Sequence, residues 1–303
     1  MKTGRLAVVL PLLAATSTLA QVPGVQVPGV QVPGVQLPPS VPAPAISGGP
    51  ASGPQTVSLS AFIYGDTRPI RTGLIWRIYQ DKGPTTPPTL AEKITAPTPT
   101  TTLQPGPYVI HVAYGLASAT KRITVTAGSV SERLMIDAGA LKLNGMIAGV
   151  EIPPERLDFS VYQPIPNDPE GRPVAMQVKA GEIVRLPEGS YHVVSTYGES
   201  NAIMRVDLKV ERGKITEATL NHRAATVTLK LVDKAGGEAF AGTAFSILTP
   251  GGDVVREAIG AFPRVALAEG EYTLIARHNG KVYTREFRVE TGLDVDVEVM
   301  ASG

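Results

Sequence analysis

The chain has 303 residues, with 28 basic and 27 acidic side chains, a formal net charge of +1 and no cysteine. This charge balance gives no electrostatic basis for nucleic-acid binding, and 5% aromatic residues are too few to predict a base-stacking surface. The lack of cysteine excludes disulfides, cysteine-ligated zinc, iron–sulfur clusters and thiol catalysis from this chain.

The first 20 residues have the pattern of an export signal. Two basic residues precede an apolar run over 6–15, and small residues at Thr18 and Ala20 suit cleavage before Gln21. The apolar run is too short to span a bilayer easily, and a proline interrupts it. Residues 1–20 are therefore predicted to be a signal peptide, and the protein to be periplasmic or secreted. No transmembrane segment is predicted in the mature chain.

A proline- and glycine-rich segment follows over residues 21–56. The sequence Gln-Val-Pro-Gly-Val occurs three times, starting at Gln21, Gln26 and Gln31, and its Pro-Gly pairs suit type II turns. These fifteen residues resemble the elastin pentapeptide. The remainder, rich in Pro, Gly, Ala and Ser, lacks the large side chains that offset ordering entropy. The segment is predicted to be a disordered, flexible tether, with self-association or surface attachment as the alternative.

A block of the form Leu-x-x-Gly-x-Tyr then recurs at intervals of 83 and 81 residues. We interpret it as a structural turn, in which the leucine ends one strand and the glycine permits a tight turn. The tyrosine would begin the next strand and bond a nearby backbone group through its hydroxyl. The alternative is a ligand-stacking tyrosine at each turn. The block comprises Leu103, Gly106 and Tyr108 in the first copy, Leu186, Gly189 and Tyr191 in the second, and Leu267, Gly270 and Tyr272 in the third.

Nearly every segment around these blocks alternates apolar and polar residues, as 206–210 shows. Short alternating strands separated by Gly and Pro turns indicate antiparallel sandwiches, and no stretch has sustained helical periodicity. We predict an all-β protein with three tandem antiparallel β-sandwiches of about seven strands each. Their predicted limits are 57–139, 140–224 and 225–303.

The second block, Leu186-Pro187-Glu188-Gly189-Ser190-Tyr191, resembles the signature turn of the carboxypeptidase-regulatory-like and PEGA families of bacterial β-sandwich domains. The other copies depart from it, with Ala268 in place of proline and Gln104-Pro105 in place of Pro-Glu. The resemblance implies an immunoglobulin-like or transthyretin-like sandwich. It also implies an accessory or surface-exposed module without catalysis of its own.

The sequence contains no motif that carries catalytic or metal chemistry. Its four histidines lack metal-ligand spacing, and neither a nucleophile elbow nor a phosphate-binding loop occurs. Two acidic clusters are calcium candidates, but the second alternates with valines as a solvated strand face does. No catalytic, cofactor-binding or metal residue is therefore predicted, and the chain is predicted not to be an enzyme. The clusters are Asp168 with Glu170, and Asp294 with Asp296 and Glu298.

Two Pro-rich stretches, 80–102 and 163–173, interrupt the repeat and are predicted to be interaction loops, since recognition often lies on loops of a rigid scaffold. Tolerated insertion is the alternative. Residues 57–139 carry a net charge of +3 and residues 225–303 one of −3, which suggests weak head-to-tail self-association. The candidate interaction residues are Lys82, Pro87, Pro88, Gln163, Asp168 and Arg172.

These features together predict an exported, non-catalytic bacterial envelope protein with a structural or adhesive role. Its expected partner is an envelope protein or a glycan. Neither a nucleic-acid partner nor a cofactor is expected. A carbohydrate-binding accessory to an envelope enzyme is the second hypothesis. A hydrolase with a site between modules is the third.

Overall fold

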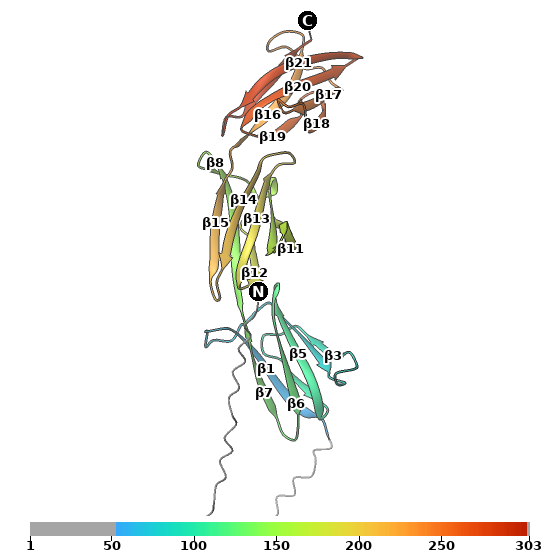
Figure 1. Cartoon of the computed structure of the whole chain (residues 1–303), viewed down its shortest axis with the longest axis vertical. Helices are drawn as coiled ribbons and strands as arrows, with labels where there is room; N and C mark the ends of the chain where they lie inside the picture. Colours follow the sequence, from blue (N-terminus) through green and yellow to red (C-terminus); the bar gives the residue numbers. More distant parts are fainter. Residues whose placement is uncertain (1–52, 302–303) are drawn as a thin grey trace, which may run out of the picture. The chain divides into compact units, whose positions relative to one another are not determined.

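A computed structural model of the chain describes residues 53–301 (Figure 1). Within that range it contains 22 strands in six sheets and one short 3-10 helix, η1 (Pro154–Arg156). The prediction of tandem all-β domains is confirmed. The predicted signal peptide and nearly all of the predicted tether lie outside the described residues. No helix in the described part of the chain has the length and apolar character needed to cross a membrane.

The strands group into three successive sandwiches, each with one sheet of four main strands and one of three. The first has sheets in the order β4-β1-β7 and β3-β2-β5-β6. Its strands are β1 (Gln55–Ile63), β2 (Leu74–Gln80), β3 (Thr89–Ile94), β4 (Thr100–Leu103), β5 (Gly106–Tyr114), β6 (Ala117–Val125) and β7 (Val130–Ile136).

The second sandwich repeats this arrangement, with sheets in the order β12-β8-β15 and β11-β10-β13-β14, and a short β9 paired with β8. Its strands are β8 (Ala138–Ile147), β9 (Val150–Glu151), β10 (Leu157–Ile165), β11 (Asp168–Lys179), β12 (Ile183–Pro187), β13 (Gly189–Tyr197), β14 (Ile203–Val210) and β15 (Ile215–Asn221).

The third sandwich has sheets in the order β19-β16-β22 and β18-β17-β20-β21. Its strands are β16 (Ala224–Val232), β17 (Thr243–Leu248), β18 (Val254–Gly260), β19 (Arg264–Ala268), β20 (Gly270–His278), β21 (Lys281–Val289) and β22 (Val295–Met300).

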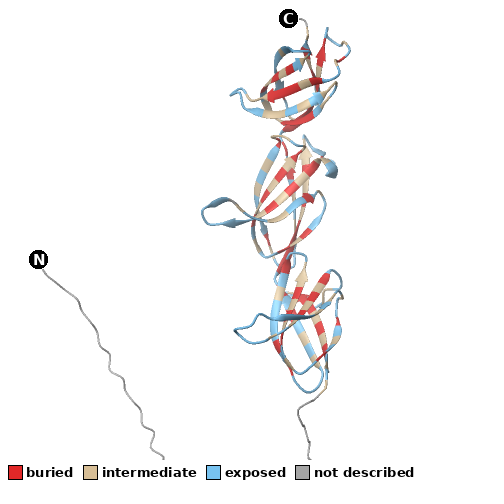
Figure 2. Ribbon diagram, turned by 90° about the vertical axis from the view of Figure 1, so that its right-hand side faces the viewer, coloured by how far each residue is buried: buried red, intermediate tan, exposed pale blue. Residues whose placement is uncertain are grey.

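Each sandwich encloses its own apolar core, seen as red bands on the facing strands in Figure 2. One aromatic residue occupies the same place in each core: Trp76, Phe159 and Phe245 have 0%, 0% and 1% of their surface exposed. The indole of Trp76 also donates a hydrogen bond to the carbonyl of Ala96 (2.9 Å). Strand alternation thus gives one buried face per sheet, and two such faces close over each aromatic residue.

One pair of strands in every sandwich runs parallel, which the sequence pattern does not predict. The first and last strands pair this way in each case: β1 with β7, β8 with β15, and β16 with β22. Alternation records which face of a strand is buried but not the direction of its neighbour, so the expectation of wholly antiparallel sheets missed these pairs.

The two predicted Pro-rich loops contain more strand than expected. Residues 80–102 include β3 and most of β4, while 163–173 form the end of the β10–β11 hairpin. The loop predicted over 163–173 is therefore the end of a β-hairpin, and its role in interaction stays a prediction. Both β3 and β11 are edge strands, where proline is tolerated because one row of backbone N–H groups needs no strand partner.

The core of the first sandwich can be tested with matched leucine substitutions. Leu74 is 1% exposed and Leu90 is 50% exposed. We expect Leu74→Ala to lower the free energy of unfolding by about 2–5 kcal/mol, because it removes buried surface and leaves a cavity. Leu90→Ala should change it by less than about 0.5 kcal/mol. Urea unfolding followed by fluorescence of Trp76, the single tryptophan, measures both. Equal effects would contradict this account of the core.

Candidate functional site

The repeated tyrosines have a structural role in all three sandwiches. Each ring is buried, and each hydroxyl donates a hydrogen bond to a carbonyl four residues earlier in the chain. The hydrogen bonds run from Tyr108 to Gln104 (3.0 Å), from Tyr191 to Pro187 (2.9 Å) and from Tyr272 to Ala268 (2.8 Å). The preceding leucines, Leu103, Leu186 and Leu267, are buried, and Gly106, Gly189 and Gly270 are the first residues of β5, β13 and β20.

The six candidate interaction residues lie at two separate places and are exposed. Lys82, Pro87 and Pro88 belong to the connection between β2 and β3 of the first sandwich. The other three lie on the β10–β11 hairpin of the second sandwich, part of the exposed surface in Figure 2. There the guanidinium of Arg172 donates to the side chain of Gln163 (2.6 Å), and Asp168 accepts the N–H of Gly171 (3.1 Å).

The carboxylates of β22 and of the residues just before it form hydrogen bonds and an ion pair within the third sandwich. Asp294 accepts the backbone N–H of Thr226 (2.7 Å), Asp296 pairs with Lys230, and Glu298 accepts the N–H of Gly236 (3.0 Å). No group of three or more acidic or histidine side chains placed to hold a metal ion occurs among residues 53–301.

The most extensive buried polar site lies between the second and third sandwiches. His222 and Arg223 are the only residues between β15 and β16, and His222 is 2% exposed. The Nε2 atom of His222 shares a hydrogen bond with the hydroxyl of Ser195 (2.8 Å). Burial lowers the pKa of His222 below its ordinary value of 6.5, and a hydrogen bond with the backbone of Ala202 partly opposes the shift. The ring is therefore neutral at neutral pH.

A second group of polar side chains joins the two sandwiches beside this histidine. The hydroxyls of Tyr197 and Thr226 are hydrogen-bonded at 3.0 Å. The guanidinium of Arg156 lies 4.8 Å from the centre of the Tyr197 ring and also donates to Thr226 (3.0 Å). Strand ends from both sandwiches are thus connected through one cluster, in which a cation lies over an aromatic face.

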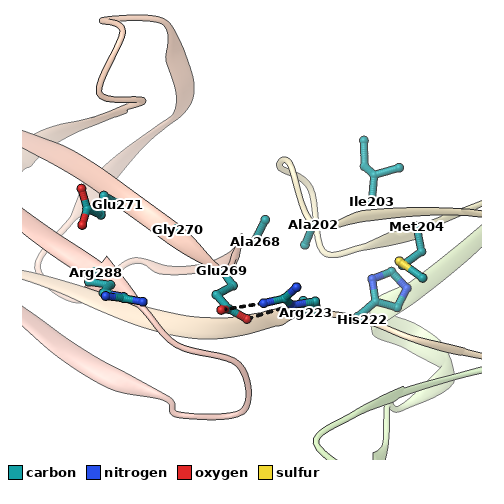
Figure 3. Close-up of a pocket in the computed structure, with 10 residues that line it drawn as sticks. All are labelled: Ala202, Ile203, Met204, His222, Arg223, Ala268, Glu269, Gly270, Glu271 and Arg288. Carbon is teal, nitrogen blue, oxygen red and sulfur yellow. Dashed lines mark hydrogen bonds and ion pairs between the residues drawn. The ribbon is translucent and has the colours of Figure 1, made fainter.

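The rim of the junction adds pairings from the turn between β13 and β14. The amide of Asn201 donates to the hydroxyl of Tyr272 (2.9 Å) and accepts the N–H of Ala268 (3.1 Å). Glu199 pairs with Arg256 (2.5 Å). A groove of about 490 Å³ opens at this junction, where two hydrogen bonds link Arg223 to Glu269 (Figure 3).

A close glycine contact occurs at both junctions, the one between the first and second sandwiches and the one between the second and third. A Cβ atom on Gly115 would lie 2.7 Å from Cβ of Arg185, and one on Gly198 would lie 2.7 Å from Cβ of Ala266. In both cases a hairpin-turn glycine rests against a strand of the following sandwich. The strand register places Asn279 at the corresponding position of the third sandwich. The predicted head-to-tail association would therefore lack the close glycine contact of both internal junctions.

Sequence reasoning missed the junction because its residues differ between copies. The tyrosine that ends β5 and β13, Tyr114 and Tyr197, is replaced by His278 at the end of β20. Arg185 lies 4.6 Å from the Tyr114 ring at the first junction, whereas Arg156 covers Tyr197 at the second. No repeated motif marks His222, and only the strand bounds show that a two-residue linker brings it against the second sandwich.

One family model matches part of the chain. Residues 226–301, in the third sandwich, match the Rhizobiales growth-associated tandem repeat domain. This match agrees with a tandem repeat, while the resemblance to carboxypeptidase-regulatory-like and PEGA domains stays a prediction. No curated protein sequence matches the chain.

Solved structures show a weaker similarity. The TIE protein of Bacillus anthracis is 15% identical with a TM-score of 0.25, and the alignment covers 82% of this chain and 51% of that one. A streptococcal ancillary pilin is 11% identical with a TM-score of 0.30, covering 82% and 98%. BcpA, the major pilin subunit of Bacillus cereus, is 11% identical with a TM-score of 0.23, covering 82% and 100%. TM-scores of this size establish no shared fold, so the sandwich architecture rests on the strand pairing described above.

The buried histidine predicts a pH dependence of the second sandwich. Because the pKa of His222 is lower in the folded chain than in the unfolded one, folding releases a proton from this site at pH values between the two. Its contribution to stability is therefore fully present above about pH 6.5 and is lost as the pH falls below that value. Hydrogen exchange of β13 and β15 between pH 7.5 and 5 should show faster opening at low pH. His222→Gln should flatten this dependence.

Proposed function

We propose that the chain is an exported, non-catalytic envelope protein whose sandwiches form a structural or adhesive module. The N-terminal sequence pattern supports export, and the tandem β architecture supports a mechanical or presenting role. The junction between the second and third sandwiches carries the proposal. Its polar cluster and two-residue linker would hold the third sandwich in place against the second, as a spacer requires.

One pairing among the described residues resembles a nucleophile and its base, and its location supports this view. Ser195 and His222 are hydrogen-bonded like a nucleophile and its base, but they are 0% and 2% exposed. A nucleophile must reach the substrate, and a fully buried serine hydroxyl does not. The histidine also bonds the backbone of Ala202, whereas a carboxylate usually orients the base of a triad. The pair therefore serves the junction in this proposal.

The spacer role can be tested with spin labels, because the chain has no native cysteine. The first pair of labels, at Lys209→Cys and Glu286→Cys, lies on the second and third sandwiches. The second pair, at Glu182→Cys and Lys209→Cys, lies within the second sandwich and serves as the control. We expect both pairs to give narrow distance distributions by pulsed electron resonance. Gly198→Ala should broaden only the first pair, since its new Cβ would meet Ala266.

Gly236→Ala is a control that separates the effect of the junction contact from the effect of backbone strain. Gly236 has φ +68, close to the +69 of Gly198, but a Cβ there would meet nothing within 4 Å. Both alanine variants therefore incur a similar cost of about 1–2 kcal/mol for the left-handed backbone, and only Gly198→Ala should loosen the junction. A broad distribution in the unsubstituted chain would contradict the spacer proposal.

The export proposal has a separate test. Cells that express the full chain should release it with the periplasm or the medium, as a form that begins at Gln21. A variant without residues 1–20 should stay in the cytoplasm. N-terminal sequencing and fractionation measure both. Recovery of the uncleaved chain in the cytoplasm would contradict export while leaving the junction results intact.

A further inference from the structure

The outer face of the β3-β2-β5-β6 sheet carries a shallow cavity in the first sandwich. Side chains on β2 and β5 alternate between the core and this face, so the neighbours of buried Trp76 and Ile110 point outward. The cavity has a volume of about 360 Å³, and Pro88 of the predicted interaction loop forms part of its wall. Its lining comprises Arg77, Tyr79, Pro88, Val109, His111 and Thr120.

Two polar side chains in this cavity have unused bonding capacity. Arg77 lies directly opposite His111 in the strand register, and it forms no ion pair among the described residues. The Nδ1 atom of His111 is buried and has no hydrogen-bond partner within residues 53–301. Burial and the charge of Arg77 both lower the pKa of His111, which keeps the ring neutral and one of its nitrogens an acceptor. His111 lines the cavity, and its neutral ring offers one nitrogen as an acceptor to a ligand hydroxyl.

The corresponding positions of the other sandwiches show that the fold does not require this pair. Ser160 pairs with Val194 in the second sandwich, and Ser246 pairs with Ile275 in the third. Tyr162 does occupy the position that matches Tyr79, so an aromatic residue alone is common to two copies. The arginine and the histidine distinguish the first sandwich.

We propose that this cavity binds a uronic-acid unit of an anionic polysaccharide. The guanidinium of Arg77 pairs with the sugar carboxylate, and a sugar hydroxyl donates to His111. The ring of Tyr79 packs against the apolar face of the sugar, beside Pro88. The net charge of +3 on residues 57–139 attracts an anionic chain. A uronic acid is the favoured occupant because it carries hydroxyl donors on the same ring as its carboxylate, whereas an acidic side chain of a peptide carries none.

This inference rests on the proposed envelope role and specifies its glycan partner. The test is calorimetric titration of residues 21–303 with oligogalacturonate, its methyl ester and polyglutamate. We expect oligogalacturonate to bind, and the methyl ester to bind roughly tenfold more weakly because it lacks the charge that Arg77 pairs with. Polyglutamate should bind as weakly as the ester.

Variants assign the binding to the cavity. Arg77→Gln and Tyr79→Ala should each weaken oligogalacturonate binding by roughly tenfold, and the matched Tyr162→Ala should leave it unchanged. Fluorescence of Trp76, in the same sandwich, verifies that the variants are folded. The proposal is overturned by an unsubstituted chain that does not bind oligogalacturonate, by equal binding of polyglutamate, or by folded Arg77→Gln protein with undiminished affinity. Narrow label distances together with absent glycan binding would leave the spacer function standing.

Discussion

The parallel pairing of first and last strands is the constraint on which the rest of the structure depends. Because β1 and β7 run in the same direction side by side, the chain enters a sandwich at one end and leaves it at the other. β8 with β15 and β16 with β22 repeat this arrangement. The next sandwich can therefore begin almost at once: one residue, Asp137, separates β7 from β8, and two separate β15 from β16.

The linker between β15 and β16 places one polar side chain, His222, in the space between the second and third sandwiches. Of the two linker residues, Arg223 is exposed and His222 is buried, so the histidine requires partners for its ring nitrogens. The hydroxyl of Ser195 and the backbone of Ala202 provide them. Such a cluster stabilises the junction and also restricts which sandwich can pack there. A neighbouring sandwich without the matching polar groups would leave buried polar atoms without hydrogen bonds. The contact of Gly198 with Ala266 adds a steric requirement to this polar one.

The sequence predicted the features that depend on local alternation and on the repeat. The tandem all-β fold follows from period-two patterns, and the buried tyrosine rings lie where the repeated block places them. Strand direction was not predictable, since a buried face looks the same for either orientation of its neighbour. The β10–β11 hairpin was missed because its prolines indicate a loop, although an edge strand tolerates them. The junction was missed because Tyr114, Tyr197 and His278 occupy one position with different partners, and a repeat comparison finds only what is shared.

The outer cavity of the first sandwich illustrates the opposite case. Arg77 and His111 are 34 positions apart and belong to no motif, so only the register of β2 against β5 makes them neighbours. Aligning the copies by that register then shows serine opposite valine or isoleucine in the other two. Once the copies are aligned by strand register, a residue found in one copy alone is not required by the shared fold. Such a residue is therefore a candidate for a function specific to that copy.

Asn279 has a consequence for how such a chain can grow. Genes for tandem modules lengthen by copying one unit, and each copy inherits the surface at both of its ends. A duplicate of the third module would follow a neighbour whose turn carries a side chain where the first two modules have none. A Cβ at this position would occupy the space that the glycine contact of the two internal junctions requires, so an added module would need a different contact there.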